Sequence, residues 1–173
     1  LDLALGDPSP KIRFAAVDVL ADQAALRKIA VTEKDAAVRG RAASKLTDQE
    51  LLSRIATTDP DAGVRKEATA RLTDDRVRRR VALEDRDGSV RATALRDLAD
   101  DPPLFARLAS QDESAEVRFY AVARLTDPIV LVRACREDKS PAVRMAALER
   151  LTDPGDLADI ARAHRDWVMS DGQ

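Results

Sequence analysis

A repeat of 26 residues runs through almost the whole sequence. A Val-Arg or Ile-Arg pair recurs along the chain, and its arginines are separated by 26, 26, 26, 27 and 26 residues. These arginines are Arg13, Arg39, Arg65, Arg91, Arg118 and Arg144. Because a fixed period of about 20–50 residues is the signature of stacked structural units, we expect the chain to fold as an array of similar modules.

Each module begins with a predicted helix, here called helix A. Relative to each arginine, Val or Ile stands one residue before, Ala three residues after and Leu seven residues after, and these offsets trace one face of a helix. Four residues before each arginine stands a Ser or Asp, which is a good N-cap. The predicted caps are Ser9, Asp35, Asp61, Asp87, Ser114 and Ser140.

A second predicted helix, helix B, follows an aspartate nine residues after each arginine. The predicted caps of helix B are Asp22, Asp48, Asp74, Asp100, Asp127 and Asp153. Thr47 competes with Asp48, because Thr47 and Glu50 have the spacing of a capping box. One extra residue near 101–103 accounts for the single spacing of 27.

Neither helix is long enough to be stable alone in water, so each must bury its apolar face against its neighbours. The sequence therefore predicts an all-α fold, a right-handed α-solenoid of six helical hairpins in one domain, residues 1–173. The predicted repeats span residues 7–32, 33–58, 59–84, 85–111, 112–137 and 138–163, with partial repeats at both ends.

The pattern Asp-x-x-x-x-Val-Arg-x-x-Ala-x-x-x-Leu, as in residues 59–72, resembles HEAT-like repeats. The short unit resembles the bacterial leucine-rich-variant repeat. Because the unit is shorter than a usual HEAT repeat, we expect helix B to be short and partly 3₁₀. The resemblance implies a protein-binding scaffold, since most HEAT-like families are scaffolds. Rarer members bind nucleic acid or act on bilins or DNA bases.

Composition narrows the classes of function. The formal net charge is -2, which does not by itself demand a nucleic-acid partner. The single cysteine, Cys135, excludes an intrachain disulfide and fits a reducing compartment, so we expect a cytoplasmic protein. No apolar run approaches the about 18 residues of a membrane span, so we expect no membrane insertion.

The repeated arginines lie inside the apolar stripe of helix A, where a charge needs a partner. A carboxylate stands six residues before each arginine, and we expect an Arg–carboxylate ladder that joins repeat to repeat. The predicted acidic members are Asp7, Glu33, Asp59, Asp85, Asp112 and Asp138.

A second column of cations lies on the predicted solvent side of helix B. Its members are Lys28, Arg54, Arg80, Arg107 and Arg133. In the third repeat, Arg78 and Arg79 add two more cations beside Arg80. One interpretation is a solvated helix flank. The other is a binding row for an acidic peptide or a phosphate backbone.

No sequence motif indicates a catalytic centre, a metal site or a cofactor, and a small-molecule ligand is not expected. Three hypotheses remain. The first is a non-catalytic scaffold that binds another protein. The second is a nucleic-acid-binding solenoid that uses the helix-B cations, although no aromatic residues interleave them. The third is an enzyme of a HEAT-like family, such as a bilin lyase or a DNA glycosylase.

Overall fold

The computed structural model describes residues 6–158, 160 and 162, and these residues are helical or in short connections, with no β-strand among them. The partial repeats predicted at the two ends lie largely outside the described residues. The chain divides into two compact units, Leu1–Ala99 and Asp100–Gln173.

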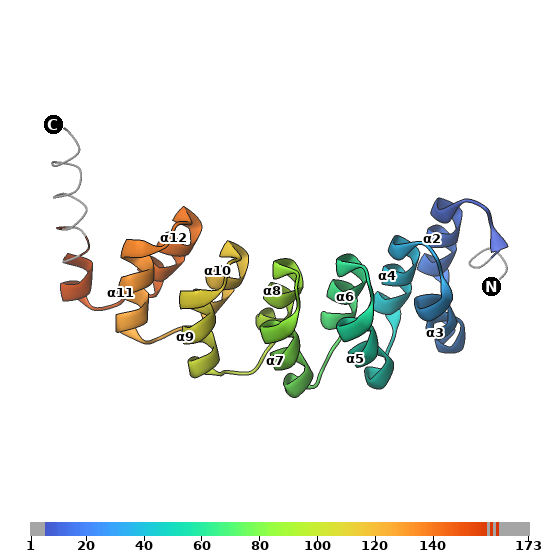
Figure 1. The fold of residues 1–173 in the computed structure, drawn as a ribbon, viewed down its shortest axis with the longest axis horizontal. Helices are drawn as coiled ribbons and strands as arrows, with labels where there is room; N and C mark the ends of the chain where they lie inside the picture. Colours follow the sequence, from blue (N-terminus) through green and yellow to red (C-terminus); the bar gives the residue numbers. More distant parts are fainter. Residues whose placement is uncertain (1–5, 159, 161, 163–173) are drawn as a thin grey trace. The chain divides into compact units, whose positions relative to one another are not determined.

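The first unit contains alternating A and B helices (Figure 1). The A helices are α2 (Pro10–Val19), α4 (Ala36–Lys45), α6 (Ala62–Thr69) and α8 (Gly88–Arg96), and the B helices are α3 (Gln23–Thr32), α5 (Gln49–Thr58) and α7 (Asp75–Glu84). Consecutive A helices pack on one another. Each B helix packs most closely on the A helix that follows it, as α3 does on α4.

The second unit has the same construction. Its A helices are α10 (Ala115–Ala123) and α12 (Pro141–Arg150), and its B helices are α9 (Pro102–Gln111) and α11 (Pro128–Glu137). Helix α10 packs on both α9 and α12, and α11 packs on α12. Residues 154–158 are also helical.

Helix B is a full α-helix, and the expectation of a short, partly 3₁₀ element is wrong. Helices α3, α5, α7, α9 and α11 each span 10 residues, and helix A spans 8–10 residues. The unit is short because the connections are short, at 46–48 and 59–61 in the second repeat. An aspartate cap lets each helix B begin at once after such a turn.

Most predicted caps are confirmed by side-chain hydrogen bonds to the first-turn amides. Asp48, and not Thr47, caps α5 through the amides of Glu50 and Leu51. In the fourth repeat Asp101, and not Asp100, caps α9, because the extra residue shifts the start of the helix. Ser9, Ser114 and Ser140 occupy N-cap positions without a side-chain cap bond.

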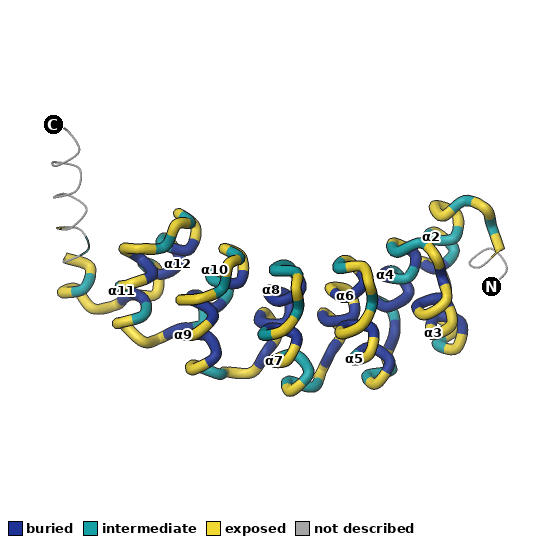
Figure 2. Tube along the Cα trace, in the orientation of Figure 1, coloured by how far each residue is buried: buried dark blue, intermediate teal, exposed yellow. Residues whose placement is uncertain are grey.

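The core follows the predicted columns of helix A (Figure 2). The Val, Ala and Leu columns are buried from the second repeat to the sixth, for example at Val64, Ala68 and Leu72. The first repeat differs, because Ile12 is 46% exposed and Ala16 and Leu20 are only half-buried. Among the described helices, α2 packs chiefly on α4, so the opposite side of α2 has no described helix over it.

Candidate functional site: the exposed face of the B helices

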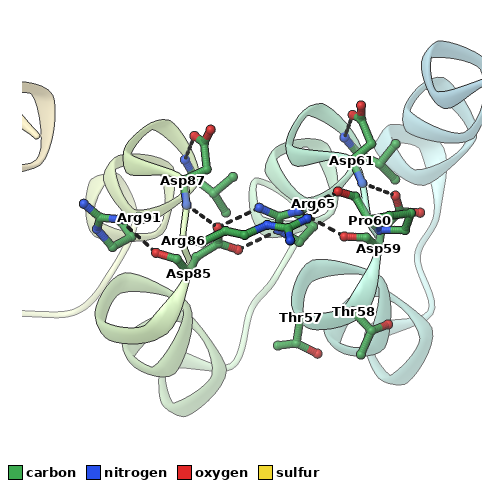
Figure 3. A network of polar contacts seen from close by, with 12 residues as sticks. Thr57, Thr58, Asp59, Pro60, Asp61, Arg65, Asp85, Arg86, Asp87 and Arg91 are labelled. Atoms are coloured by element: carbon green, nitrogen blue, oxygen red, sulfur yellow. Dashed lines mark hydrogen bonds and ion pairs between the residues drawn. The ribbon is translucent and has the colours of Figure 1, made fainter.

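The side chains of the repeated arginines bind other groups inside the fold. Arg65 is buried, and its Nε and Nη2 atoms donate to the two carboxylate oxygens of Asp85 at 2.8 and 2.9 Å. Its Nη1 donates to the backbone carbonyl of Asp59 at 3.0 Å (Figure 3). Two-pronged Arg–carboxylate bonds are strong and directional, so this contact fixes how α6 meets the turn after α7.

The same arrangement recurs in other repeats. Two-pronged bonds at 2.7–3.0 Å join Arg13 to Glu33, Arg39 to Asp59, and Arg118 to Asp138. All six repeated arginines donate through Nη1 to the backbone carbonyl of the residue six positions earlier. The carboxylate in each of these pairs therefore belongs to the following repeat, and the residue six positions earlier contributes its carbonyl.

Each ladder carboxylate also holds the turn in front of the next helix A. The Oδ1 atom of Asp85 accepts from the amide of Asp87 at 2.9 Å, and that of Asp138 accepts from Ser140 at 2.8 Å. The bond from Arg118 holds the pKa of Asp138 below its usual range, and the bond to Asp85 raises the pKa of Arg65. These polar groups serve packing and are turned inward, so the ladder is a structural element.

The sequence analysis did not predict a contact that we call the glutamine clamp. In it, a glutamine at the start of one helix B binds the connection between helices A and B of the next repeat. Gln49 Nε2 donates to the carbonyl of Arg71 at 3.0 Å, and its Oε1 accepts from the amide and hydroxyl of Thr73 at 2.9 and 3.0 Å. Gln23 makes equivalent bonds to Lys45 and Thr47. The only sequence signal was a Gln directly after the cap of helix B in two repeats.

The predicted helix-B cations lie on the surface. Lys28, Arg54 and Arg80 of the first unit are exposed, as are Arg107 and Arg133 of the second. Arg80 and Arg133 pair with Glu84 and Glu137 one helical turn later, in exposed contacts that contribute little stability. Among the described residues, the side chains of Lys28, Arg54 and Arg107 make no hydrogen bond or ion pair.

Arg78 lies apart from this column. It is half-buried, and its guanidinium donates to Asp75, to the carbonyl of Asp97 at 2.9 Å and to the carbonyl of Leu72. Two residues along an α-helix turn the side chain by about 200°, which carries Arg78 away from Arg80. Arg79 is exposed beside Arg80.

The exposed face of the first unit's B helices is strongly cationic. We call it the B-helix face and define it by the exposed charged residues of α3, α5 and α7. Six are cations: Arg27, Lys28, Arg54, Arg76, Arg79 and Arg80. Only two are carboxylates, Glu50 and Glu84. The half-buried cap residues Asp48 and Asp74 lie beside this face and pair with Arg27 and Arg76. The exposed residues are nonetheless mostly cations, in a chain whose formal net charge is -2.

Open grooves separate neighbouring B helices on this face. Between α3 and α5 the groove is lined by Lys28, Val31 and Arg54, among others. Between α5 and α7, Thr57 and Arg80 line two adjoining hollows. In the second unit, Arg133 and Glu137 line a groove between α9 and α11.

The described residues include no group of three or more His, Cys, Asp or Glu side chains placed to hold a metal ion. Within the same part of the chain, no helix has the length and apolar character of a membrane span. Cys135 is buried, and desolvation raises the pKa of its thiol, so the thiol stays protonated and unreactive at neutral pH.

Comparison with known proteins adds no family to this description. No protein-family model matches the sequence, and a search of curated proteins finds no significant match.

Proposed function

We propose that this chain is a non-catalytic scaffold that binds a segment of another protein, and that its binding surface is the B-helix face. One observation carries the proposal: helices α3, α5 and α7 together expose six cations and only two carboxylates, in a chain whose net charge is -2. The grooves between these helices offer the concave, partly apolar surface that a peptide needs.

The architecture we propose for this scaffold is a single right-handed α-solenoid of six HEAT-like hairpins. Its support is the sequence, where the repeat columns continue through the boundary near residue 100 with one inserted residue. Regular stacked repeats present extended binding surfaces, and this is the common use of such folds. A cytoplasmic location suits the single, buried, unpaired cysteine.

A nucleic-acid partner fits the face less well. Carboxylates of Asp48 and Glu50 line the groove between α3 and α5, and those of Asp74, Glu84 and Asp85 line the hollows between α5 and α7. A continuous phosphate backbone that crossed these grooves would meet them and be repelled. A polypeptide of mixed charge can place its own residues to avoid them, so the face favours protein over nucleic acid.

Selection from a random peptide-display library tests this proposal. Enriched peptides should bind the full chain. Their affinity should fall at least about tenfold for a variant with K28Q, R54Q and R80Q, here called the row variant. A control variant with K11Q, K34Q and K66Q removes three exposed cations outside the B helices and should bind normally. Failure to enrich any peptide would contradict the proposal.

A random DNA duplex, titrated in parallel across a salt series, separates the two partner classes. Weak duplex binding that the row variant leaves unchanged is expected. Tight binding that falls steeply with salt and is lost in the row variant would instead establish the nucleic-acid alternative.

A further inference from the structure

We propose that this protein associates with further copies of itself head to tail, so that α2 of one copy packs on α12 of another as the next helix A. The partner of both surfaces is thus a second copy of the chain. These surfaces are separate from the B-helix face, and the association does not depend on the peptide binding proposed above.

Neighbouring A helices inside the fold meet through two kinds of contact. The repeated arginine of one helix binds a carboxylate in the turn before the next, as Arg65 binds Asp85 (Figure 3). The residue after that arginine faces the residue before the next one, because a Cβ on Gly40, which follows Arg39, would lie 3.8 Å from Val64. A second copy that continues the stack must supply both contacts.

Asp7, in the turn before α2, is held like a carboxylate of the ladder. Its Oδ1 accepts from the amide of Ser9 at 2.8 Å, as Oδ1 of Asp138 accepts from the amide of Ser140 at 2.8 Å. Oδ2 of Asp138 binds Nε of Arg118, whereas Oδ2 of Asp7 makes no hydrogen bond or ion pair with a described residue. Asp7 is therefore positioned to accept from an arginine.

Arg144 of α12 offers the complementary basic group. Its Nη1 donates to the carbonyl of Asp138 at 2.8 Å, as in the other repeats. Its Nε and Nη2 atoms, which bind a carboxylate elsewhere in the ladder, have no such partner in the described part of the chain. Twenty residues after Arg144 the sequence has His164, where four of the other repeated arginines are followed by Asp or Glu. The carboxylate of Asp7 from a second copy completes this contact.

Exposed apolar side chains lie at the second kind of contact. Ile12, which precedes the repeated arginine of α2, is 46% exposed, and Met145, which follows that of α12, is 57% exposed. The later members of the Ile12 column are at most 1% exposed, and they are Val38, Val64, Val90, Val117 and Val143. In the register of Gly40 and Val64, Met145 of one copy faces Ile12 of the next, and burial of both favours association.

Two more apolar side chains extend these surfaces. Val19 of α2 is 86% exposed, and its column faces the preceding repeat, because Lys45 and Arg150 at the same position donate to backbone carbonyls there. Leu157 is 36% exposed, whereas Leu131 at the same position of α11 is 1% exposed. Each helix B packs most closely on the helix A that follows it, so α2 of a second copy would cover Leu157.

The two surfaces differ from each other, so one copy can bind a second copy at each end. Head-to-tail contacts of this kind add copies in series unless the rotation between them closes a ring. The expected products are oligomers that grow with protein concentration.

An exchange of the two charges tests the proposal on the full chain. In sedimentation velocity across the micromolar range, the average mass of the wild type should rise with concentration. D7R and R144D should each need at least about tenfold more protein for the same association, because each variant alone places like charges at the contact. An equimolar mixture of D7R and R144D should regain wild-type association, because every contact between unlike copies again joins an arginine to an aspartate.

Two further variants control this test. E116R reverses an exposed charge of α10, away from both surfaces, and should leave association unchanged. I12Q changes an exposed side chain and should weaken association about tenfold while circular dichroism shows an intact fold.

A wild type that stays monomeric at every concentration would overturn the proposal. Wild-type association of D7R or R144D alone would also overturn it, as would a mixture of the two folded variants that associates no better than either alone. If either charge variant fails to fold, I12Q decides, and wild-type association of I12Q would then contradict the proposed contact.

Discussion

Arg65 of α6 and Asp85, the C-cap residue that follows α7, form a two-pronged ion pair, at 2.8 and 2.9 Å, that is almost entirely closed to solvent. The side chains are 4% and 6% exposed. Nη1 of the arginine holds the carbonyl of Asp59, and Oδ1 of the aspartate holds the amide of Asp87. One buried contact thus positions the turns that precede two successive A helices.

Loss of this arginine should destabilise the protein far more than loss of an exposed one. R65A leaves the buried carboxylate of Asp85 without its counter-charge, and we expect the free energy of unfolding to fall by about 3 kcal/mol. R80A removes an exposed charge and should change it by less than about 0.5 kcal/mol. Urea denaturation measures both, and equal shifts would contradict the structural role of the ladder.

The ladder should also make stability depend on pH in the acidic range. Arg118 lowers the folded-state pKa of Asp138 below the unfolded value of about 3.9. A depressed pKa stabilises the fold above the unfolded value, and this contribution is lost as the pH falls through the folded value. D138N should therefore be less stable than the wild type at pH 7, by about 2 kcal/mol, and the gap should close toward pH 3.

The control for this pH series is E149Q, which removes an exposed carboxylate of α12. Its unfolding free energy should track that of the wild type from neutral to acidic pH. A gap between D138N and the wild type that stays constant with pH would show that the charge of Asp138 does not contribute.

The helices and core columns were predictable because the repeat presents the same pattern several times. The partner of each arginine was harder to assign. A carboxylate six residues before one arginine is also 20 residues after the previous arginine, so one column satisfies both pairings. In the fold, Glu33 uses both: its carboxylate binds Arg13, and its carbonyl binds Arg39. Periodicity alone cannot separate the two roles.

Contacts made by residues outside the shared columns could not be predicted from the sequence. The sequence places Arg78 close to Arg80, yet the guanidinium of Arg78 binds the backbone carbonyls of Leu72 and Asp97. The Gln49 clamp depends on the path of the connection at 71–73, which no pattern of apolar residues records. Both bind backbone groups, whose positions are set only when the repeats stack.

The glutamine clamp should contribute measurable stability. Q49A removes a donor to Arg71 and an acceptor for two groups of Thr73, and we expect a loss of about 1 kcal/mol in the free energy of unfolding. Q111A, at an exposed site near the end of α9, should have almost no effect. If T73V costs the same in the wild-type and Q49A backgrounds, the two residues are not coupled.

Two glycines should respond differently to alanine. A Cβ on Gly40, in the interior of α4, would meet Val64 and Glu67 at 3.7–3.8 Å, which is ordinary contact, so G40A should stabilise the protein by about 0.5–1 kcal/mol. A Cβ on Gly63 would meet Oδ1 of Asp61 at 3.0 Å, and that atom caps α6. The gain from G63A should be smaller. Thermal denaturation of the two variants checks this order.

The most direct test of the binding surface is site-specific photo-cross-linking of a display-selected peptide. A benzoylphenylalanine in place of Thr57 lies on the grooves between α5 and α7, and one in place of Lys66 is exposed on helix A of the next repeat. We predict that the peptide cross-links at position 57 and not at position 66. Cross-linking at position 66 alone, or equally at both positions, would show that the B-helix face is not where the partner binds.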